Sequence, residues 1–243
     1  MPGETPDYGV LSANQTVYPV TDLSELAVRL GAIPSIDRTG DVIFADSFED
    51  GLNKWSAGWG MVAGAVRTSM ETARSGRYSA LLSAGVAAGA EVNIAHYLPL
   101  PVLSNLGLEA HSALDSNSDL FFLTIVLYTG ASLVIGILQY DFTAKEVRVY
   151  NPVGGYTTIA TGVNLMADHK VFHAFKLVID PISQTYLRAI IDSTTYNLSA
   201  HGLFIFPAAN DPMAEIHVNQ KSNVAALCDV YVDDVIATQN EVA

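Results

Sequence analysis

The chain is poor in cysteine and in basic residues. Cys228 is its only cysteine among 243 residues, so no disulfide can form within the chain. In its apolar surroundings this side chain is expected to behave as a small buried hydrophobe. Twelve Lys and Arg stand against 25 Asp and Glu, which gives a formal net charge of −13. A surface this acidic repels phosphate groups and anionic lipid, so nucleic-acid and membrane partners are not expected.

The chain also lacks the patterns of export and of membrane insertion. Residues 1–15 contain neither a basic stretch nor an apolar core, so no signal peptide is predicted and synthesis and folding in the cytoplasm are expected. The longest apolar run, Leu120–Tyr140, is interrupted at Thr129–Ser132 and is rich in β-branched and aromatic residues. This pattern predicts two antiparallel strands with Gly130 in the turn, rather than one membrane-spanning helix.

Motifs of the common catalytic and metal sites are absent. The sequence contains no H-E-x-x-H, nucleophile elbow, phosphate-binding loop or dinucleotide fingerprint, and its six histidines are scattered. His169 and His173 have a helical metal-site spacing, but they enter a predicted strand, where residues four apart stand well separated. The glutamates of the predicted strands occur singly, as on a solvated strand face: Glu91, Glu109, Glu146 and Glu215. These absences predict a protein without catalytic residues.

Residues 1–40 differ from the rest of the chain. They contain four prolines and little periodic hydrophobicity. A capping-box pattern at Asp22–Glu25, followed by an apolar stretch and Gly31, predicts one short helix near residues 22–30. We interpret this region as an extended N-terminal arm that binds neighbouring subunits, although it could also pack along its own domain. The residues expected to make these contacts are Tyr8, Leu11, Tyr18, Leu23, Leu26 and Leu30.

Residues 41–243 have a strand pattern throughout. Short runs rich in β-branched and aromatic residues recur, separated by turn sequences such as NPVGG and DPISQ. This arrangement predicts an all-β fold, a two-sheet antiparallel β-sandwich of the jelly-roll type, as one domain after the arm. Alternation along the strands predicts that several residues face the core, among them Phe48, Trp55, Phe175 and Val235.

Three segments, in order, resemble a known superfamily. ADSFEDGLNKW (45–55) resembles the opening strand of concanavalin A-like and carbohydrate-binding-module jelly rolls, and VYVDDVIAT (230–238) resembles their closing strand. HAFKLVIDPISQTYLRAIIDSTTYNLS (173–199) resembles their central hairpin. The superfamily includes lectins, glycan-binding modules, glycosidases and jelly-roll components of virus particles. The acid motif E-x-D-x-x-E of one catalytic branch is missing here, which argues against a glycosidase.

Two sets of residues are candidates for ligand binding. The resemblance implies structural calcium near the paired first and last strands, where carboxylates occur at Asp46, Glu49, Asp50, Asp233 and Asp234. A plain acidic turn and a strand cap explain the same residues, and no other cofactor is expected. Carbohydrate recognition uses exposed aromatic rings beside polar groups. Four aromatic residues lie in or next to predicted turns, although such tyrosines are also ordinary surface residues: Trp59, Tyr140, Tyr150 and Tyr156.

Two functions from different classes fit these observations. The first is a non-catalytic structural protein of a virus particle, namely a phage capsid decoration or tail-associated jelly roll. Its arm would bind its own subunits and a major capsid or other virion protein, and the protein would end in the assembled particle. The alternative is a carbohydrate-binding module or lectin with a glycan partner, and a glycoside hydrolase is a third option. The absence of a signal peptide, a disulfide and a catalytic motif, together with the arm, favours the virion protein.

Overall fold

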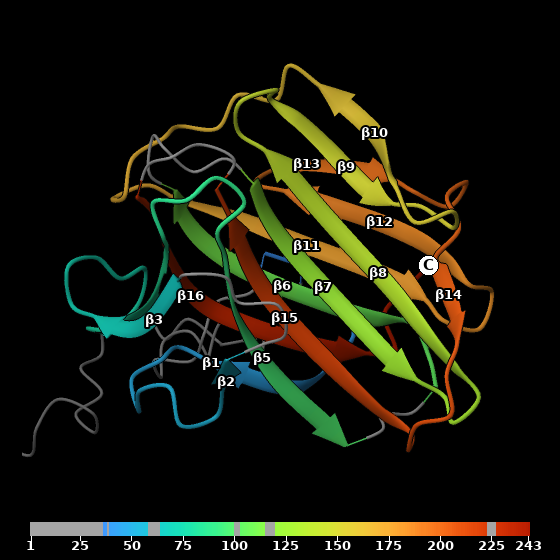
Figure 1. Cartoon of the computed structure of the whole chain (residues 1–243). Helices are drawn as coiled ribbons and strands as arrows, with labels where there is room; N and C mark the ends of the chain where they lie inside the picture. Colours follow the sequence, from blue (N-terminus) through green and yellow to red (C-terminus); the bar gives the residue numbers. More distant parts are fainter. Residues whose placement is uncertain (1–35, 38, 58–63, 100–102, 115–119, 223–226) are drawn as a thin grey trace, which may run out of the picture. The chain divides into compact units, whose positions relative to one another are not determined.

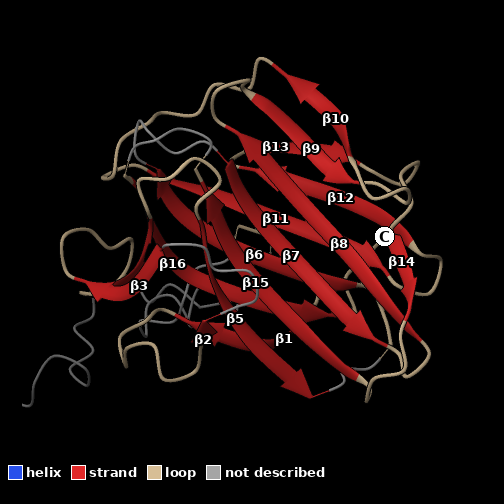
Figure 2. Cartoon of the chain, in the orientation of Figure 1, coloured by secondary structure: helices blue, strands red, loops and turns tan. Residues whose placement is uncertain are grey.

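The computed structural model describes residues 36–243 except 38, 58–63, 100–102, 115–119 and 223–226. In this part of the chain the regular elements are strands, and no helix occurs (Figure 2). The strands are β1 (Asp41–Asp46), β2 (Ser56–Ala57), β3 (Gly64–Ser69), β4 (Ser79–Ala84), β5 (Glu91–Pro99), β6 (Leu106–Leu114), β7 (Leu120–Tyr128), β8 (Ser132–Asp141), β9 (Glu146–Tyr150), β10 (Tyr156–Thr161), β11 (Phe172–Asp180), β12 (Thr185–Ile191), β13 (Thr194–Asn197), β14 (Phe204–Pro207), β15 (Met213–Lys221) and β16 (Cys228–Gln239). The helix and the contact residues predicted for the arm lie outside the described residues.

Two antiparallel sheets form a sandwich (Figure 1). The front sheet, nearer the viewer in Figure 1, has the order β10-β9-β8-β7-β15-β5-β2, with β14 paired to β8. The back sheet has the order β13-β12-β11-β6-β16-β4-β3, with β1 paired to β16. The pairing of β1 with β16 brings the two ends of the sandwich together. The predicted all-β sandwich is confirmed.

The apolar run near the middle of the chain forms a hairpin. β7 and β8 pair from Leu120 with Asp141 to Tyr128 with Leu133. Gly130 lies in the connecting turn with φ 91°, a conformation that glycine adopts without steric cost. In the described part of the chain no helix is long and apolar enough to cross a membrane. The prediction of two adjacent strands is confirmed.

The core lies between the two sheets. Side chains alternate along each strand, so Phe121 of β7 points inward and meets Phe175 of β11 with ring centroids 4.8 Å apart. The fully buried Tyr186 of β12 also links the sheets. Its hydroxyl donates to the Tyr150 carbonyl at 2.7 Å and accepts from the Ile137 amide at 3.0 Å. The residues predicted to face the core lie in it or pack against it: Phe48, Trp55, Phe175 and Val235.

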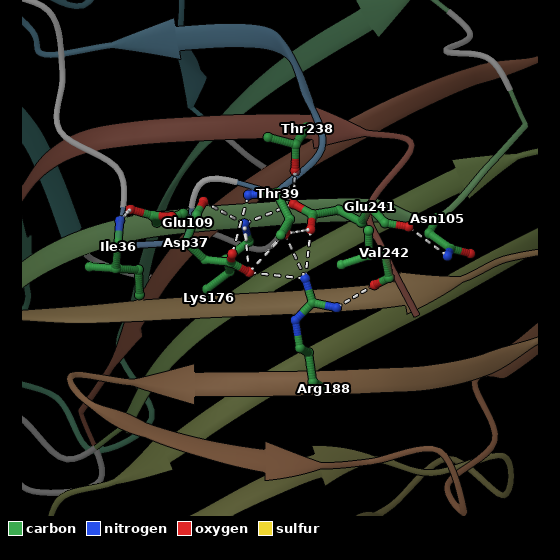
Figure 3. Close-up of polar contacts among 10 residues, drawn as sticks. All are labelled: Ile36, Asp37, Thr39, Asn105, Glu109, Lys176, Arg188, Thr238, Glu241 and Val242. Atoms are coloured by element: carbon green, nitrogen blue, oxygen red, sulfur yellow. Dashed lines mark hydrogen bonds and ion pairs between the residues drawn. The ribbon is translucent and has the colours of Figure 1, made fainter. Parts of the chain in front are cut away.

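A buried group of charged residues ties both ends of the described chain to the back sheet (Figure 3). The Lys176 side chain of β11 has no exposed surface, and its Nζ lies 2.8 Å from Glu241 Oε1 and 3.3 Å from Asp37 Oδ2. Arg188 of β12 lies 2.9 Å from Asp37 and 2.7 Å from Glu241. Burial opposes ionisation of Asp37, but the Arg188 hydrogen bond and the Lys176 charge hold its pKa below the usual value. We call these four residues the ion cluster; its two cations balance its two carboxylates.

Candidate functional site

A groove of about 360 Å³ lies on the outer face of the front sheet. Residues of β5, β7, β8, β9, β10 and β15 line it: Glu91, Leu120, Phe122, Thr124, Ile137, Gln139, Arg148, Tyr156, Asn219 and Lys221. Strand alternation turns them away from the core, because their chain neighbours, such as Phe121 and Leu123, point between the sheets. The groove is therefore built by strand residues whose positions the hydrogen-bonded sheet holds in place.

The strand register brings distant residues of the groove side by side. Asn219 pairs with Phe122, Phe122 with Gln139, and Gln139 with Arg148, so four strands contribute one row of side chains. Side chains directly opposed in this way have Cβ atoms about 4.5–5.5 Å apart. The row combines an aromatic ring with two amides and a guanidinium. Such a mixture suits a ligand that has both an apolar face and hydrogen-bonding edges.

Aromatic rings form one wall of the groove. Tyr156, the first residue of β10, is 41% exposed, and its ring centroid lies 6.4 Å from that of Phe122. The Tyr150 ring lies 5.2 Å from Tyr156 and 5.2 Å from Phe204 of β14. The exposed ring of Tyr156 offers a flat apolar surface next to polar groups.

The charged groups in and around the groove are paired. Arg148 contacts Asp141 at 2.8 Å and Glu146 at 2.7 Å, and Lys221 lies 3.9 Å from Glu91. The hydrogen bond from Arg148 lowers the pKa of Glu146. The acid of a glycosidase needs the opposite shift. Glu146 is therefore placed as an ion-pair partner and not as a proton donor.

Beside the groove, Glu215 and His217 of β15 form a buried pair. His217 Nε2 lies 2.9 Å from Glu215 Oε2, and the register sets His217 opposite Thr124 of the groove. An ionised carboxylate only accepts hydrogen bonds, so in a neutral imidazole facing it Nε2 carries the proton and Nδ1 keeps a lone pair. Burial, followed by the charge of Glu215, raises the pKa of Tyr128 on the neighbouring strand. The pair thus presents an oriented imidazole that can accept a proton.

The structure brings together two of the four aromatic residues predicted to bind carbohydrate. Tyr150 and Tyr156 form the aromatic wall described above. Tyr140 is only 1% exposed, and its hydroxyl donates to the Val163 carbonyl at 2.8 Å. Its prediction as a binding residue is wrong, because its position in β8 turns the ring into the core. Trp59 lies outside the described residues.

Most of the other groove residues have no signal in the sequence. Phe122 belongs to an apolar run whose two faces look alike, and Gln139 and Asn219 are single amides in separate strands. Only the pairing register shows that these three side chains share one face. The Glu215-x-His217 spacing is a signal that could have been found, because residues two apart on a strand point the same way.

The predicted calcium ligands near β1 are engaged by protein donors. Asp46 accepts hydrogen bonds from Lys54 Nζ at 2.9 Å and from the Trp55 indole at 2.7 Å. Glu49 accepts two backbone amides of the loop before β4, at 2.7 and 2.9 Å, and Asp50 is exposed. These three carboxylates therefore make separate local contacts.

The predicted calcium ligands of β16 contact the same loop before β4. Asp233 Oδ2 accepts two of its backbone amides at 2.8 and 3.0 Å. Asp234 lies 2.5 Å from the Arg74 guanidinium and accepts the Ser75 hydroxyl at 2.6 Å. Burial raises the pKa of Asp233 to about 7. Among the described residues no three acidic, histidine or cysteine side chains form a metal-binding group, so calcium binding stays a prediction.

Comparison with known proteins gives matches in fold alone. No protein-family model and no curated protein matches the sequence. The endo-β-1,4-glucuronan lyase of the fungus Trichoderma reesei matches with a TM-score of 0.59 and 12% identity, over 82% of this chain and 96% of the lyase. The potassium-bound carbohydrate recognition domain of Emp46p matches with a TM-score of 0.51 and 8% identity, over 82% of this chain and 94% of that domain. The resemblance to concanavalin A-like jelly rolls is thereby confirmed at the level of the fold.

These comparisons correct the predicted function. Of the two solved structures compared above, one is a polysaccharide lyase and the other is a carbohydrate recognition domain. The prediction of a non-catalytic virion protein is therefore wrong. The prediction that the protein is not an enzyme is wrong as well, because a polysaccharide lyase shares this fold. That prediction depended on the absence of familiar catalytic motifs, including the acid motif E-x-D-x-x-E. A missing motif argues against one catalytic branch and leaves other chemistries on the same fold untouched.

Proposed function

We propose that this protein is carbohydrate-active and binds a glycan in the groove of the front sheet. The observation that supports this function is the row of Asn219, Phe122, Gln139 and Arg148 beside the exposed ring of Tyr156. A sugar ring has apolar C–H faces and hydroxyl edges, so it needs a stacking surface and polar partners together. The groove offers both on one face, and the carbohydrate-active proteins that share the fold support the same assignment.

The dimensions of the groove favour a chain of sugars over a single sugar. Its lining residues come from six strands that are adjacent in the front sheet, from β10 to β5. Neighbouring strands lie about 4.8 Å apart, so this face extends roughly 24 Å across the strands. That length accommodates several consecutive sugar rings.

Tyr156→Ala is expected to weaken glycan binding about tenfold, because covering an aromatic ring contributes on the order of 1.5 kcal/mol. The wild-type protein would first be screened against immobilised plant, fungal and bacterial polysaccharides, and the variants then titrated calorimetrically with an oligosaccharide of the bound type. Tyr78→Ala is the matched control, since this half-buried tyrosine lies in the loop before β4 of the back sheet. Equal weakening by both variants, or no binding by the wild type, would contradict the proposed function.

A second candidate function is cleavage of the bound glycan. The observation that favours it is the pair of Glu215 and His217 next to groove residue Thr124. In this pair the carboxylate holds the imidazole in one orientation with a free lone pair, as a base that takes a proton requires. His217 would then accept a proton from water as the water oxygen bonds to the anomeric carbon and the glycosidic C–O bond breaks. The leaving oxygen would take up a proton from a second water molecule, and Glu215 would stabilise the resulting imidazolium.

A further inference from the structure

The cations of the groove are already neutralised by the protein. Arg148 bridges Asp141 and Glu146 at 2.8 and 2.7 Å, and Lys221 lies 3.9 Å from Glu91. These five groups comprise three carboxylates and two cations, so the described part of the groove and its rim is slightly acidic. Recognition of a carboxylate usually employs an arginine whose two-pronged guanidinium is available to it. Arg148 instead directs its guanidinium at residues of its own sheet.

The amide of Asn219 adds a buried acceptor to the groove. Its Nδ2 donates to Glu91 Oε1 at 3.4 Å, and since a carboxylate only accepts, this contact sets the orientation of the amide. Asn219 Oδ1 is buried and has no hydrogen-bond partner. A sugar hydroxyl can donate to this oxygen, whereas an ionised uronate carboxylate brings only further lone pairs. The position therefore favours hydroxyl groups over carboxylates.

We infer, on the basis of the proposed function, that the groove selects a neutral, hydroxyl-rich glycan and discriminates against chains of uronic acids. Three observations agree: the net charge of −13, the pairing of both groove cations, and the buried acceptor of Asn219. An acidic protein repels a polyanion over its whole surface, and the groove offers no compensating cation among its described residues. Selectivity arises here because the carboxylate of a uronate chain cannot donate a hydrogen bond to Asn219 and is repelled by the carboxylates of the groove and its rim.

The test compares glycans that differ only in their carboxyl groups. Uronate polysaccharides such as glucuronan, polygalacturonate and alginate would each be used in native form and after chemical reduction of the carboxyl groups to alcohols. We expect any backbone that binds to bind at least about tenfold more tightly in the reduced form, with an affinity that does not change between low and high salt. Tighter binding of the native form, lost at high salt, would overturn the inference and leave the proposed function standing. If neutral polysaccharides and both forms of every backbone fail to bind, the proposed function itself is overturned.

Two variants separate the contributions of charge and hydroxyl recognition. Glu91→Gln keeps an acceptor for Asn219 but releases Lys221, so its affinity for native uronate chains is expected to rise several-fold. Asp50→Asn makes the same change in net charge at an exposed turn and should leave the preference unchanged. Asn219→Leu removes the buried acceptor and is expected to weaken neutral-glycan binding about tenfold. If Glu91→Gln and Asp50→Asn behave alike, or Asn219→Leu binds as well as the wild type, the inference fails.

Discussion

Replacing Lys176 by methionine is expected to lower the free energy of unfolding by about 3–5 kcal/mol, the cost of leaving a buried ion without its partner. The ammonium group is fully buried and lies 2.8 Å from Glu241, whose side chain is also fully buried (Figure 3). Methionine fills a similar volume but leaves two carboxylates, Asp37 and Glu241, to be balanced by Arg188 alone. The variant therefore retains the packing and loses the charge balance.

Urea unfolding of the wild type and the variant at neutral pH measures this loss. Lys221→Met is the control, because Lys221 and Glu91 are partly exposed and 3.9 Å apart, and such pairs contribute less than about 1 kcal/mol. Adding Asp37→Asn to Lys176→Met should restore part of the stability, since it removes one uncompensated charge. A Lys176→Met protein as stable as the Lys221→Met control would show that the ion cluster contributes nothing to the fold.

The ion cluster could not have been predicted from the sequence. Its members lie before β1, in β11, in β12 and after β16, and each is an ordinary charged residue in its local context. What brings them together is the arrangement of β11 and β12 in the back sheet and the return of both chain ends to that sheet. Asp37 falls within the region predicted to be a separate arm, yet it contacts Lys176 and Arg188 of the sandwich.

The fold, in contrast, follows closely from local sequence signals. Turn sequences and alternating runs delimit the strands, and the interrupted apolar run at 120–140 indicates its hairpin directly. These signals are short in range, so the sequence contains them. Which strands lie side by side is decided by pairings between residues such as Asn219 and Phe122, which are far apart in the chain. The groove depends on those pairings, and its lining therefore emerges only from the structure.

The motif-based prediction of function failed for a related reason. The glutamates at 91, 109, 146 and 215 look equivalent in the sequence, each alone in its strand. In the structure Glu146 forms an ion pair with Arg148, and Glu109 accepts a hydrogen bond from the Ile36 amide at 2.7 Å. Glu215 contacts the imidazole of His217. A search for fixed spacings between acidic residues cannot distinguish these environments. The partner of each carboxylate is either a residue far away in the chain or a residue two positions along the same strand, on the same face.

His217→Gln is expected to reduce glycan cleavage by about 10²–10⁴-fold, the contribution typical of a general base. Glutamine can still occupy the site and bond to Glu215, but it cannot take up a proton. The rate would be followed as new reducing ends released from the glycan found in the binding screen. A parallel ultraviolet absorbance measurement should show no new conjugated double bond, because elimination of that kind needs a uronate carboxyl and the groove is inferred to select neutral glycans; cleavage is therefore expected to be hydrolysis.

The division between kcat and KM separates a catalytic role from a structural one. Loss of the base should lower kcat and leave KM within about twofold, because substrate binding depends on the groove and not on the imidazole. Glu215→Gln should also lower kcat, since it removes the carboxylate that orients the ring and stabilises the imidazolium. His201→Gln, in the turn after β13, is the matched control and should retain wild-type kinetics. A His217→Gln protein that keeps its kcat, or one that loses activity only through a higher KM, would show that the pair positions the sheet and does not take part in cleavage.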